Sequence, residues 1–386
     1  MHTFFPTDTP FPIHAPMKIN TPPFTGSVPL LRESRGRRGL LLSVLPLLAW
    51  MLAAPGSLPA QTAADSVPAG YNTFTAAGTG GAPGVVLSFN APGLTPDVEW
   101  RGTSTAIGAN TLTDSTATWT QDKFNGANGA YYIEITSAGG SATAAGVGTF
   151  HTITATTAAS KMLTFAANLP AGVATPIGYR IRKQWTIAGV FGAANSAGLQ
   201  GGTAVSADRL LVWNGGGFDT YYYQTTGIGG TGWRNAAARS TDASGTVILP
   251  NQFFLVKRGQ SAAVSVNVNG SIKAGQTTAG IAAGFNFIAN PYAVDMTLAS
   301  CGIYTGNAST GLAGGSAATA DLVLLWNGTG FDTYFYQTSG GTGWRKTTDL
   351  ATDAGATALP AGTGFIVRRV NSGAFTWIMP PHPASL

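Results

Sequence analysis

Two stretches of the chain are nearly the same sequence: ADRLLVWNGGGFDTYYYQTTG at residues 207–227 and ADLVLLWNGTGFDTYFYQTSG at residues 320–340. Each begins with a continuous apolar run of strand length. Asn and Gly follow and supply the positive φ angles that a tight turn needs, and an aromatic run then returns. The sequence therefore predicts one β-hairpin that occurs twice.

The likeness extends well beyond the hairpin. GTGWR recurs at residues 230–234 and 341–345, and FLVKR at residues 254–258 corresponds to FIVRR at residues 365–369. Recurrence of several motifs in the same order indicates duplication of a whole folding unit of roughly 85 residues. No segment after residue 60 shows sustained helical periodicity, because Gly or Pro interrupts most windows.

These patterns predict an all-β protein. We expect an N-terminal β-rich domain followed by two homologous repeat units, each built as a β-sandwich or a small barrel. The predicted boundaries are 61–170 for the N-terminal domain, 171–275 for the first repeat unit and 276–386 for the second.

An export signal precedes these domains. Residues 35–60, RGRRGLLLSVLPLLAWMLAAPGSLPA, combine a basic start, an apolar core and small residues before a cleavage site after Ala60. The core is short for a membrane-spanning helix of about 20 residues, so retention as an anchor is the alternative rather than the first expectation. Residues 1–34 are predicted to be a disordered leader, and translation starts at Met1 or Met17.

Composition and charge narrow the classes of protein. Only 10% of the residues are charged, against about 25% in an ordinary soluble domain, and 52 are Gly. The 9 Trp, 11 Tyr and 19 Phe are too much apolar surface for a disordered chain. The formal net charge of +5 comes largely from the leader. No basic cluster longer than a pair follows it, so we expect no nucleic-acid partner.

Residues that could carry catalysis are sparse. His151 and His382 are the histidines after the signal, and neither accompanies a G-x-S-x-G nucleophile motif. The single cysteine, Cys301, lies in an apolar setting typical of a buried, inert thiol. Glu99 and Glu134 are the glutamates after residue 60, and nothing pairs them for glycoside hydrolysis. We expect no catalytic residues, no cofactor and no metal site, with calcium bound by scattered Asp residues left open.

The hairpin supplies the candidate binding residues. Alternate residues of a strand face opposite sides, so Phe218, Thr220 and Tyr222 share one face, which we predict to be the core. The other face is predicted to point outward and to bind a ligand, because Tyr and Trp rings stack on sugars. The predicted ligand-binding residues are Asp219, Tyr221, Tyr223, Trp233, Asp332, Tyr334, Tyr336 and Trp344.

Two alternatives stay open for these residues. The rings could instead fill the small cores of the repeat units, where large aromatic side chains contribute much of the burial. We interpret the acids as members of cross-strand ion pairs, Asp219 with Arg234 and Asp332 with Arg345.

Several longer motifs carry a family resemblance. YYIEITS, YRIRKQWTIAGVFG, GFNFIANPYAVDMTLASCGI and the WNGxGFDTYxYQ…GWR units resemble a paralogous family of uncharacterised exported proteins of Verrucomicrobia. The resemblance covers nearly all of the chain after the signal. It implies a secreted, repetitive β-architecture, and it implies no activity, cofactor or catalytic residue.

The sequence thus favours an exported structural or adhesive protein of the cell envelope or extracellular space, with no catalytic activity. Its expected location is the periplasm, the outer surface or the medium, and no transmembrane helix is expected after signal removal. The first alternative is a carbohydrate-binding protein that uses outward aromatic residues, and the second is a divergent hydrolase. The expected partners are cell-surface or extracellular polysaccharide, or further copies of the chain.

Overall fold

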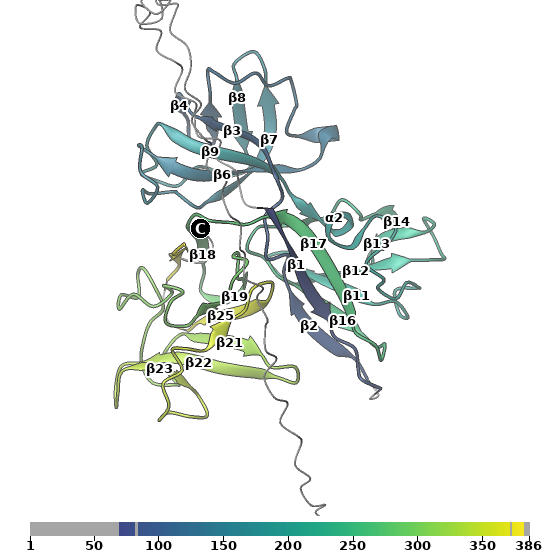
Figure 1. The fold of residues 1–386 in the computed structure, drawn as a ribbon, viewed down its shortest axis with the longest axis vertical. Helices are drawn as coiled ribbons and strands as arrows, with labels where there is room; N and C mark the ends of the chain where they lie inside the picture. The colour runs from purple at the N-terminus through teal and green to yellow at the C-terminus, as the bar shows by residue number, and fades with distance from the viewer. Residues whose placement is uncertain (1–68, 82–83, 371–372, 382–386) are drawn as a thin grey trace, which may run out of the picture. The chain divides into compact units, whose positions relative to one another are not determined.

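The structure, a computed structural model, describes residues 69–81, 84–370 and 373–381. The predicted leader (1–34) and signal (35–60) lie outside the described residues. Residues 65–386 belong to one compact unit. Within it the all-β prediction is confirmed, because the described helices are only α2 (Ile187–Phe191) and the single 3-10 turn η1 (Gly126–Asn128) (Figure 1).

The first repeat unit is built on a six-stranded antiparallel sheet that contains the hairpin of residues 207–227. Its strands, in spatial order, are β14 (Ala238–Asp242), β13 (Gly232–Asn235), β12 (Phe218–Gln224), β11 (Arg209–Trp213), β16 (Phe254–Arg258) and β2 (Val86–Asn90). Trp213 pairs with Phe218 across the turn, where Gly215 has a φ of 98°. The Gly of the turn thus has the predicted positive φ, whereas Asn214 does not and instead accepts hydrogen bonds through Oδ1 from the backbone N–H groups of Gly216 and Gly217.

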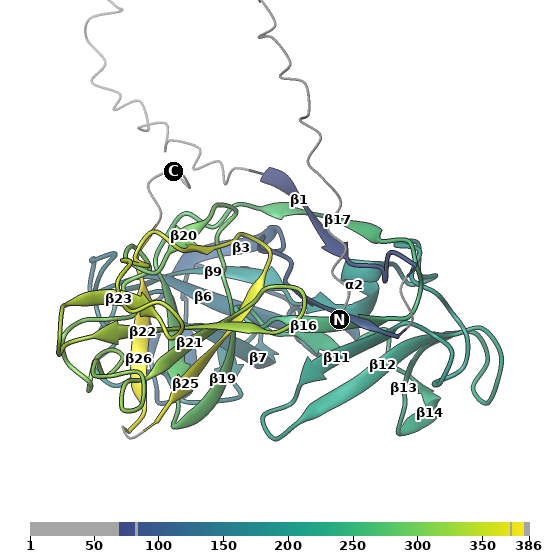
Figure 2. The same ribbon diagram turned by 90° about the horizontal axis from the view of Figure 1, so that it is seen from below.

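A two-stranded ribbon packs on one face of this sheet. The ribbon pairs β1 (Ala69–Ala76) with β17 (Val264–Ser271), as Figure 2 shows from a second direction. Phe74 of β1 and Val266 of β17 share a core with Leu210 and Tyr221 of the sheet. The short pair β10 (Trp185–Thr186) and β15 (Val247–Ile248) closes the same core together with α2.

The second repeat unit has the same plan. Its five-stranded sheet has the order β19 (Gly284–Ala289), β25 (Gly364–Arg369), β21 (Leu322–Trp326), β22 (Phe331–Gln337) and β23 (Gly343–Lys346). Its ribbon pairs β18 (Thr277–Ile281) with β26 (Phe375–Met379), and its short pair is β20 (Met296–Thr297) with β24 (Ala358–Leu359). Trp377 of the ribbon and Tyr334 of the sheet belong to one core.

A third body lies between β2 and β10 in the chain, and we call residues 98–183 the inserted domain. Its seven-stranded sheet has the order β3 (Val98–Thr103), β9 (Ile177–Lys183), β6 (Tyr131–Ala138), β7 (Phe150–Thr157), β8 (Met162–Phe165), β5 (Thr111–Thr113) and β4 (Ala106–Ile107). Every strand contributes to a single core, from Trp100 on β3 to Ile107 on β4. The sheet therefore curls around that core.

The strand pairing groups the chain differently from the boundaries predicted at residues 170 and 171. Strands β1 and β2 precede the inserted domain in the chain, yet they pair with β17 and β16 of the first repeat unit. Strand β9 lies beyond residue 170, yet it pairs with β3 and β6. The first repeat unit is therefore discontinuous in sequence.

The two ends of the inserted domain meet at its junction with the first repeat unit. The indole Nε1 of Trp185 donates a hydrogen bond to the carbonyl of Leu94 at 2.9 Å. Thr95 also exchanges backbone hydrogen bonds with Ser271 at the end of β17. Neighbouring chain ends are what a domain inserted into another domain requires.

The two repeat units contact each other through aromatic rings on the sheet faces opposite their ribbons. Trp213 lies 4.4 Å from Phe287 between ring centroids, and Trp326 lies 5.2 Å from Phe89. The Trp residues are equivalent in the two hairpins, and Phe89 and Phe287 occupy equivalent edge strands, β2 and β19. The contact is therefore pseudo-twofold, each unit offering the same pair of rings to the other.

Candidate functional site

The predicted ligand-binding rings lie mostly inside the protein. Tyr221 and Tyr334 are each only 7% exposed, and Trp233 and Trp344 are buried beside them. The prediction that this hairpin face points outward is therefore wrong. The physical reason is the ribbon of each unit, which covers the face and adds its own apolar side chains to the same core.

Tyr223 and Tyr336 are half-buried rather than fully exposed. Tyr223 contacts Trp233 edge-to-face at 5.4 Å, and Tyr336 contacts Trp344 at 5.7 Å. Tyr336 also stacks on Tyr304 at 3.5 Å between centroids. These rings pack against one another, which fits the alternative that the aromatic residues of the repeats build cores.

The predicted ion pairs of the hairpin acids are also wrong. Arg234 pairs with Asp242 at 3.4 Å rather than with Asp219, and Arg345 pairs with Asp353 at 3.2 Å rather than with Asp332. The strand register explains the difference, because Arg234 lies opposite Tyr222. A side chain opposite residue 222 projects from the other face of the sheet to residue 219.

Each hairpin acid has a different partner. Asp219 accepts a hydrogen bond from the Asn214 amide at 3.0 Å. Asp332 pairs with Lys346 at 2.9 Å and accepts from the Asn327 amide at 3.1 Å. The Lys346 ammonium lowers the pKa of the Asp332 carboxyl, so this acid remains ionised at neutral pH. Both acids brace the turn of their own hairpin.

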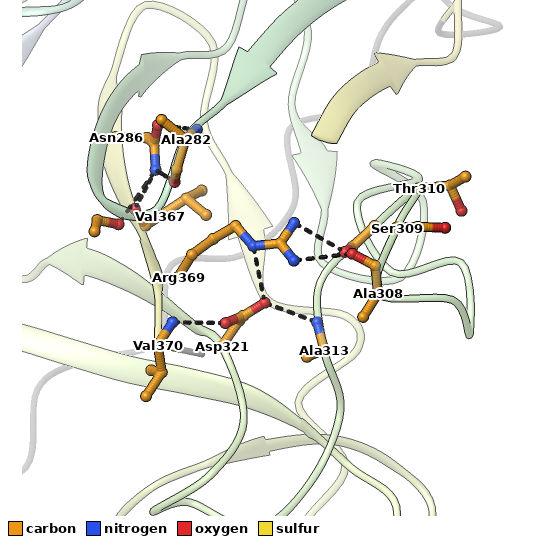
Figure 3. A network of polar contacts seen from close by, with 12 residues as sticks. Ala282, Asn286, Ala308, Ser309, Thr310, Ala313, Asp321, Val367, Arg369 and Val370 are labelled. Carbon is orange, nitrogen blue, oxygen red and sulfur yellow. Dashed lines mark hydrogen bonds and ion pairs between the residues drawn. The ribbon is translucent and has the colours of Figure 1, made fainter. Parts of the chain in front are cut away.

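A buried ion pair that the sequence analysis did not identify occurs once in each repeat unit. Arg258 Nε lies 2.9 Å from Asp208 Oδ2, and Arg369 Nε lies 3.5 Å from Asp321 Oδ2. Figure 3 shows the second pair, in which Asp321 also accepts hydrogen bonds from the backbone of Ala313 and Val370. The repeat alignment carried the signal, since Asp and Arg recur at equivalent positions in both units.

A third buried charge cluster lies at the junction with the inserted domain. Glu134 of β6 pairs with Arg182 of β9 at 3.2 Å and with Lys273, which follows β17. All three side chains are almost completely buried. Burial alone would raise the pKa of the Glu134 carboxyl, but Lys273 and Arg182 outweigh it and lower that pKa to about 2. The Glu134 carboxylate is therefore ionised at neutral pH, whereas burial lowers the pKa of the Lys273 ammonium. The cluster joins the inserted domain to the segment between the repeat units.

The same face of β6 carries Tyr132, which lines the candidate functional site. This site is a cleft bounded by all three bodies of the compact unit. The inserted domain contributes Tyr132, Phe150 and His151 and is followed at once by Gln184; the first repeat unit contributes the loop 249–252; the second contributes Thr278, Ala279, Gly280, Phe287, Ile288 and Thr376. Clefts between domains are frequent ligand sites.

Two buried polar atoms at this cleft lack a hydrogen-bond partner among the described residues. They are the Tyr132 hydroxyl and the Oε1 atom of Gln184. The amide nitrogen of Gln184 is satisfied, because it donates to Thr152 Oγ1 at 3.1 Å. Tyr132 packs edge-to-face on Phe150 at 5.5 Å, which fixes the direction of its ring. Buried polar atoms normally have partners, so these two leave hydrogen-bonding capacity unused in the wall of the cleft.

The cleft is uncharged near neutral pH. The described residues that line it include no Asp, Glu, Lys or Arg. Burial lowers the pKa of His151, whose Nε2 lies 2.9 Å from Thr149 Oγ1. Burial also raises the pKa of the Tyr132 hydroxyl. Both groups are therefore neutral at pH 7, and the cleft offers hydrogen bonds and apolar contact to a ligand.

Three further features of the described residues concern a metal site, a membrane-spanning helix and a reactive thiol. Within residues 69–81, 84–370 and 373–381, no three His, Cys, Asp or Glu side chains gather closely enough to hold a metal ion. In that same part of the chain, no helix has the length and apolar character of a membrane span. Cys301 is buried, and burial raises the pKa of its thiol to about 12.

Comparison with known proteins gives no relative to guide the assignment. No protein-family model, no curated protein and no solved structure matches the chain.

Proposed function

We propose that this chain is an exported structural or adhesive protein of the cell envelope or extracellular space, without catalytic activity. One observation carries the proposal: the inserted domain is joined to the rest of the compact unit by the buried cluster of Glu134, Arg182 and Lys273. A fixed joint of this kind keeps binding surfaces at constant spacing, which a structural or adhesive protein needs.

Two further contacts make the joint rigid. Arg182 also donates to the carbonyl of Pro96, just before β3, and Ser271 donates to Asp97 at 2.9 Å. The first bond joins the two chain ends of the inserted domain to each other, and the second ties the first of these ends to the end of β17. Separating the members of a buried charge pair is strongly unfavourable because it leaves each charge buried without a partner. A bend that separated them would therefore be unfavourable.

Export is tested by expressing the full chain in a Gram-negative host and fractionating the cells. The proposal expects a processed chain that begins at Gln61 in the periplasm, the outer membrane fraction or the medium, as determined by intact mass. A variant with Leu41→Arg and Leu47→Arg in the apolar core of the predicted signal is the matched control, and it should remain unprocessed. An uncut wild-type chain in the cytoplasm would contradict the proposal.

The adhesive role is tested by sedimentation of the purified mature chain with isolated cell envelopes. We expect it to sediment with the envelopes at moderate salt, whereas a chain unfolded by heat and cooled should not do so specifically. A mature chain that stays entirely in the supernatant with every envelope preparation would argue against adhesion. A structural role through self-association would then require higher-order species in sedimentation velocity.

The carbohydrate-binding alternative remains a second candidate, but on different residues. The tyrosines first assigned to it lie in or against the cores, whereas the cleft is lined by Tyr132 and Gln184, whose hydroxyl and carbonyl oxygen atoms are buried and lack a partner among the described residues. That observation favours a ligand site in the cleft.

A further inference from the structure

We propose that the cleft bounded by Tyr132, Gln184 and Phe287 binds a short segment of neutral saccharide. The inference goes beyond the structural role, and it does not depend on where the protein is exported. It names a site and a ligand class that the repeat tyrosines do not provide. Four properties of the cleft carry it: unpartnered polar atoms, neutrality, fixed aromatic rings and an exposed apolar rim.

The unpartnered oxygen atoms of Tyr132 and Gln184 are suited to hydrogen bonds with hydroxyl groups. Tyr132 is 1% exposed and Gln184 is 5% exposed, and both residues line the cleft, so a ligand reaches their polar atoms only by pressing against this wall and shifting the side chains. Gln184 Oε1 can only accept a hydrogen bond, whereas the Tyr132 hydroxyl can donate or accept. A sugar hydroxyl both donates and accepts, and neighbouring hydroxyls on one ring can serve the two atoms together.

The lack of charge on the residues that line the cleft favours uncharged ligands over charged ones. No described lining residue is acidic or basic, and His151 and Tyr132 are both held neutral by burial. A carboxylate, sulfate or phosphate on the ligand would lose its hydration, and the cation beside the Phe150 ring, Lys273, is already paired with Glu134. The cleft therefore suits an uncharged polymer rather than an acidic one.

The apolar part of the cleft suits the CH faces of a sugar ring. Phe150 and Phe287 are half-buried and line the cleft from two different bodies. Phe287 is held in place by Trp213 at 4.4 Å and by Phe218 at 5.1 Å. Rings that are already fixed lose little entropy when a ligand stacks on them.

The rim of the cleft offers further contact area. Leu249 is 49% exposed and lies beside Pro250 and Asn251 on the loop between β15 and β16. Asn251 has a φ of 61°, and its carbonyl accepts a hydrogen bond from the backbone of Ala289 in the second repeat unit. The loop is thereby anchored, so the rim forms part of a preformed site.

The test measures binding of defined oligosaccharides to the purified mature chain, residues 61–386, by isothermal titration calorimetry. The neutral probes are cellohexaose, xylohexaose, mannohexaose and chitohexaose. Hexagalacturonate is the acidic probe, and an uncharged Ser-Gly-Asn hexapeptide represents polypeptide. We expect at least one neutral saccharide to bind and the acidic probe and the peptide not to bind.

The variants locate the binding. Tyr132→Phe and Gln184→Met each remove one of the two polar atoms and keep the shape of the side chain. Each should weaken the saccharide by roughly 3- to 10-fold, the value of one neutral hydrogen bond. Tyr131→Phe is the matched control, because Tyr131 is the adjacent tyrosine and packs in the core of the inserted domain. It should bind like the wild type.

Several results would overturn the inference. They are binding of no neutral probe, binding that Tyr132→Phe and Gln184→Met leave unchanged, and preference for hexagalacturonate or for the peptide. Thermal unfolding of each variant shows whether it is folded, and a folded Tyr132→Phe with full affinity is decisive against the cleft. Failure here leaves the export and sedimentation results untouched, so the two proposals fail separately.

Discussion

The two repeat units share one plan, and two of their differences bear on how they pack. Their hairpins and buried Asp–Arg pairs correspond residue by residue, and each unit has a two-stranded ribbon. Between β2 and β10 the first unit carries the inserted domain, whereas the second connects β19 to β20 through the short segment 290–295. The second difference is a single pair of equivalent residues, Phe253 and Gly364. The shared parts build each sheet, and the differences decide how the units face each other.

Phe253 and Gly364 occupy the centre of the contact between the units. Phe253 precedes FLVKR and Gly364 precedes FIVRR, so they are equivalent in sequence. A Cβ atom on Gly364 would lie 2.2 Å from Cγ of Phe253, which is far inside van der Waals contact. The side chain of one copy therefore fills the space that the other copy would need, and two identical units could not pack in this way.

The largest effect should come from exchanging these two residues. Phe253→Gly empties a fully buried ring position and should lower the free energy of unfolding by about 4–6 kcal/mol. Gly364→Phe alone should also destabilise, because the site is already filled. The double variant should lose clearly less than the sum of the two single changes, as measured by urea unfolding. Strict additivity would contradict the shared space.

Removing the arginine of either buried pair should come next. Arg369→Met leaves Asp321 charged and buried, and Arg258→Met does the same to Asp208. Each should lower the free energy of unfolding by about 3–5 kcal/mol. Asp321→Asn with Arg369→Met is the control, since it removes both charges and keeps an acceptor for one of the two backbone N–H groups, those of Ala313 and Val370, that bond to Asp321. If only one unit responds, the two pairs are not equivalent.

The junction of the inserted domain should respond to acid. The pKa of Glu134 is about 2 in the folded protein and lies near 4.5 in an unfolded chain. The pairing therefore stabilises the fold fully above pH 4.5, and this contribution of about 3 kcal/mol is lost as the pH falls towards 2.

Glu134→Gln should lower the free energy of unfolding at pH 7 and flatten its dependence on pH between 4.5 and 2. Urea unfolding at pH 6 and pH 3 measures both effects. Asp332→Asn is the control on the surface of the second repeat unit, and it should leave most of the acid sensitivity in place. An unchanged pH profile in Glu134→Gln would show that the cluster does not couple folding to pH.

The smallest effect should follow from removing the hairpin hydroxyl groups. The Tyr221 hydroxyl lies 3.5 Å from Asp219, at the limit of a hydrogen bond. Tyr221→Phe and Tyr334→Phe should each change the free energy of unfolding by less than about 1 kcal/mol. Tyr221→Ala should cost several times more, because the ring fills the core. A large effect of Tyr221→Phe would contradict this, because it would show that the hydroxyl contributes substantially to stability.

The local parts of the fold could be predicted from the sequence. The apolar runs on either side of Asn-Gly predict the β11–β12 and β21–β22 hairpins, because the residues of a hairpin are neighbours in the sequence. The inward and outward faces of the hairpin could not be assigned in this way. Their burial depends on β1 and β17, which are distant in the chain and lie on either side of the inserted domain.

The cleft and the Glu134 cluster could not be predicted from the local sequence either, because they too depend on residues distant in the chain. Tyr132 and Glu134 alternate with apolar residues in YYIEITSA, which resembles a strand with one solvent-exposed face. That face is covered by residues after β17, and no pattern within the strand shows it. The Asp–Arg pairs were within reach, because both members recur at equivalent positions of the two units.

The most direct test of the account is deletion of the inserted domain. Residues 98–183 are replaced by a short Gly-Ser linker between Asp97 and Gln184, where Trp185 already contacts Leu94. We predict that the shortened chain folds with a single cooperative unfolding transition. It should also retain the near-ultraviolet circular dichroism of Trp213 and Trp326 at the contact between the units. A chain that loses this signal and unfolds without cooperativity would contradict a discontinuous first repeat unit packed on the second.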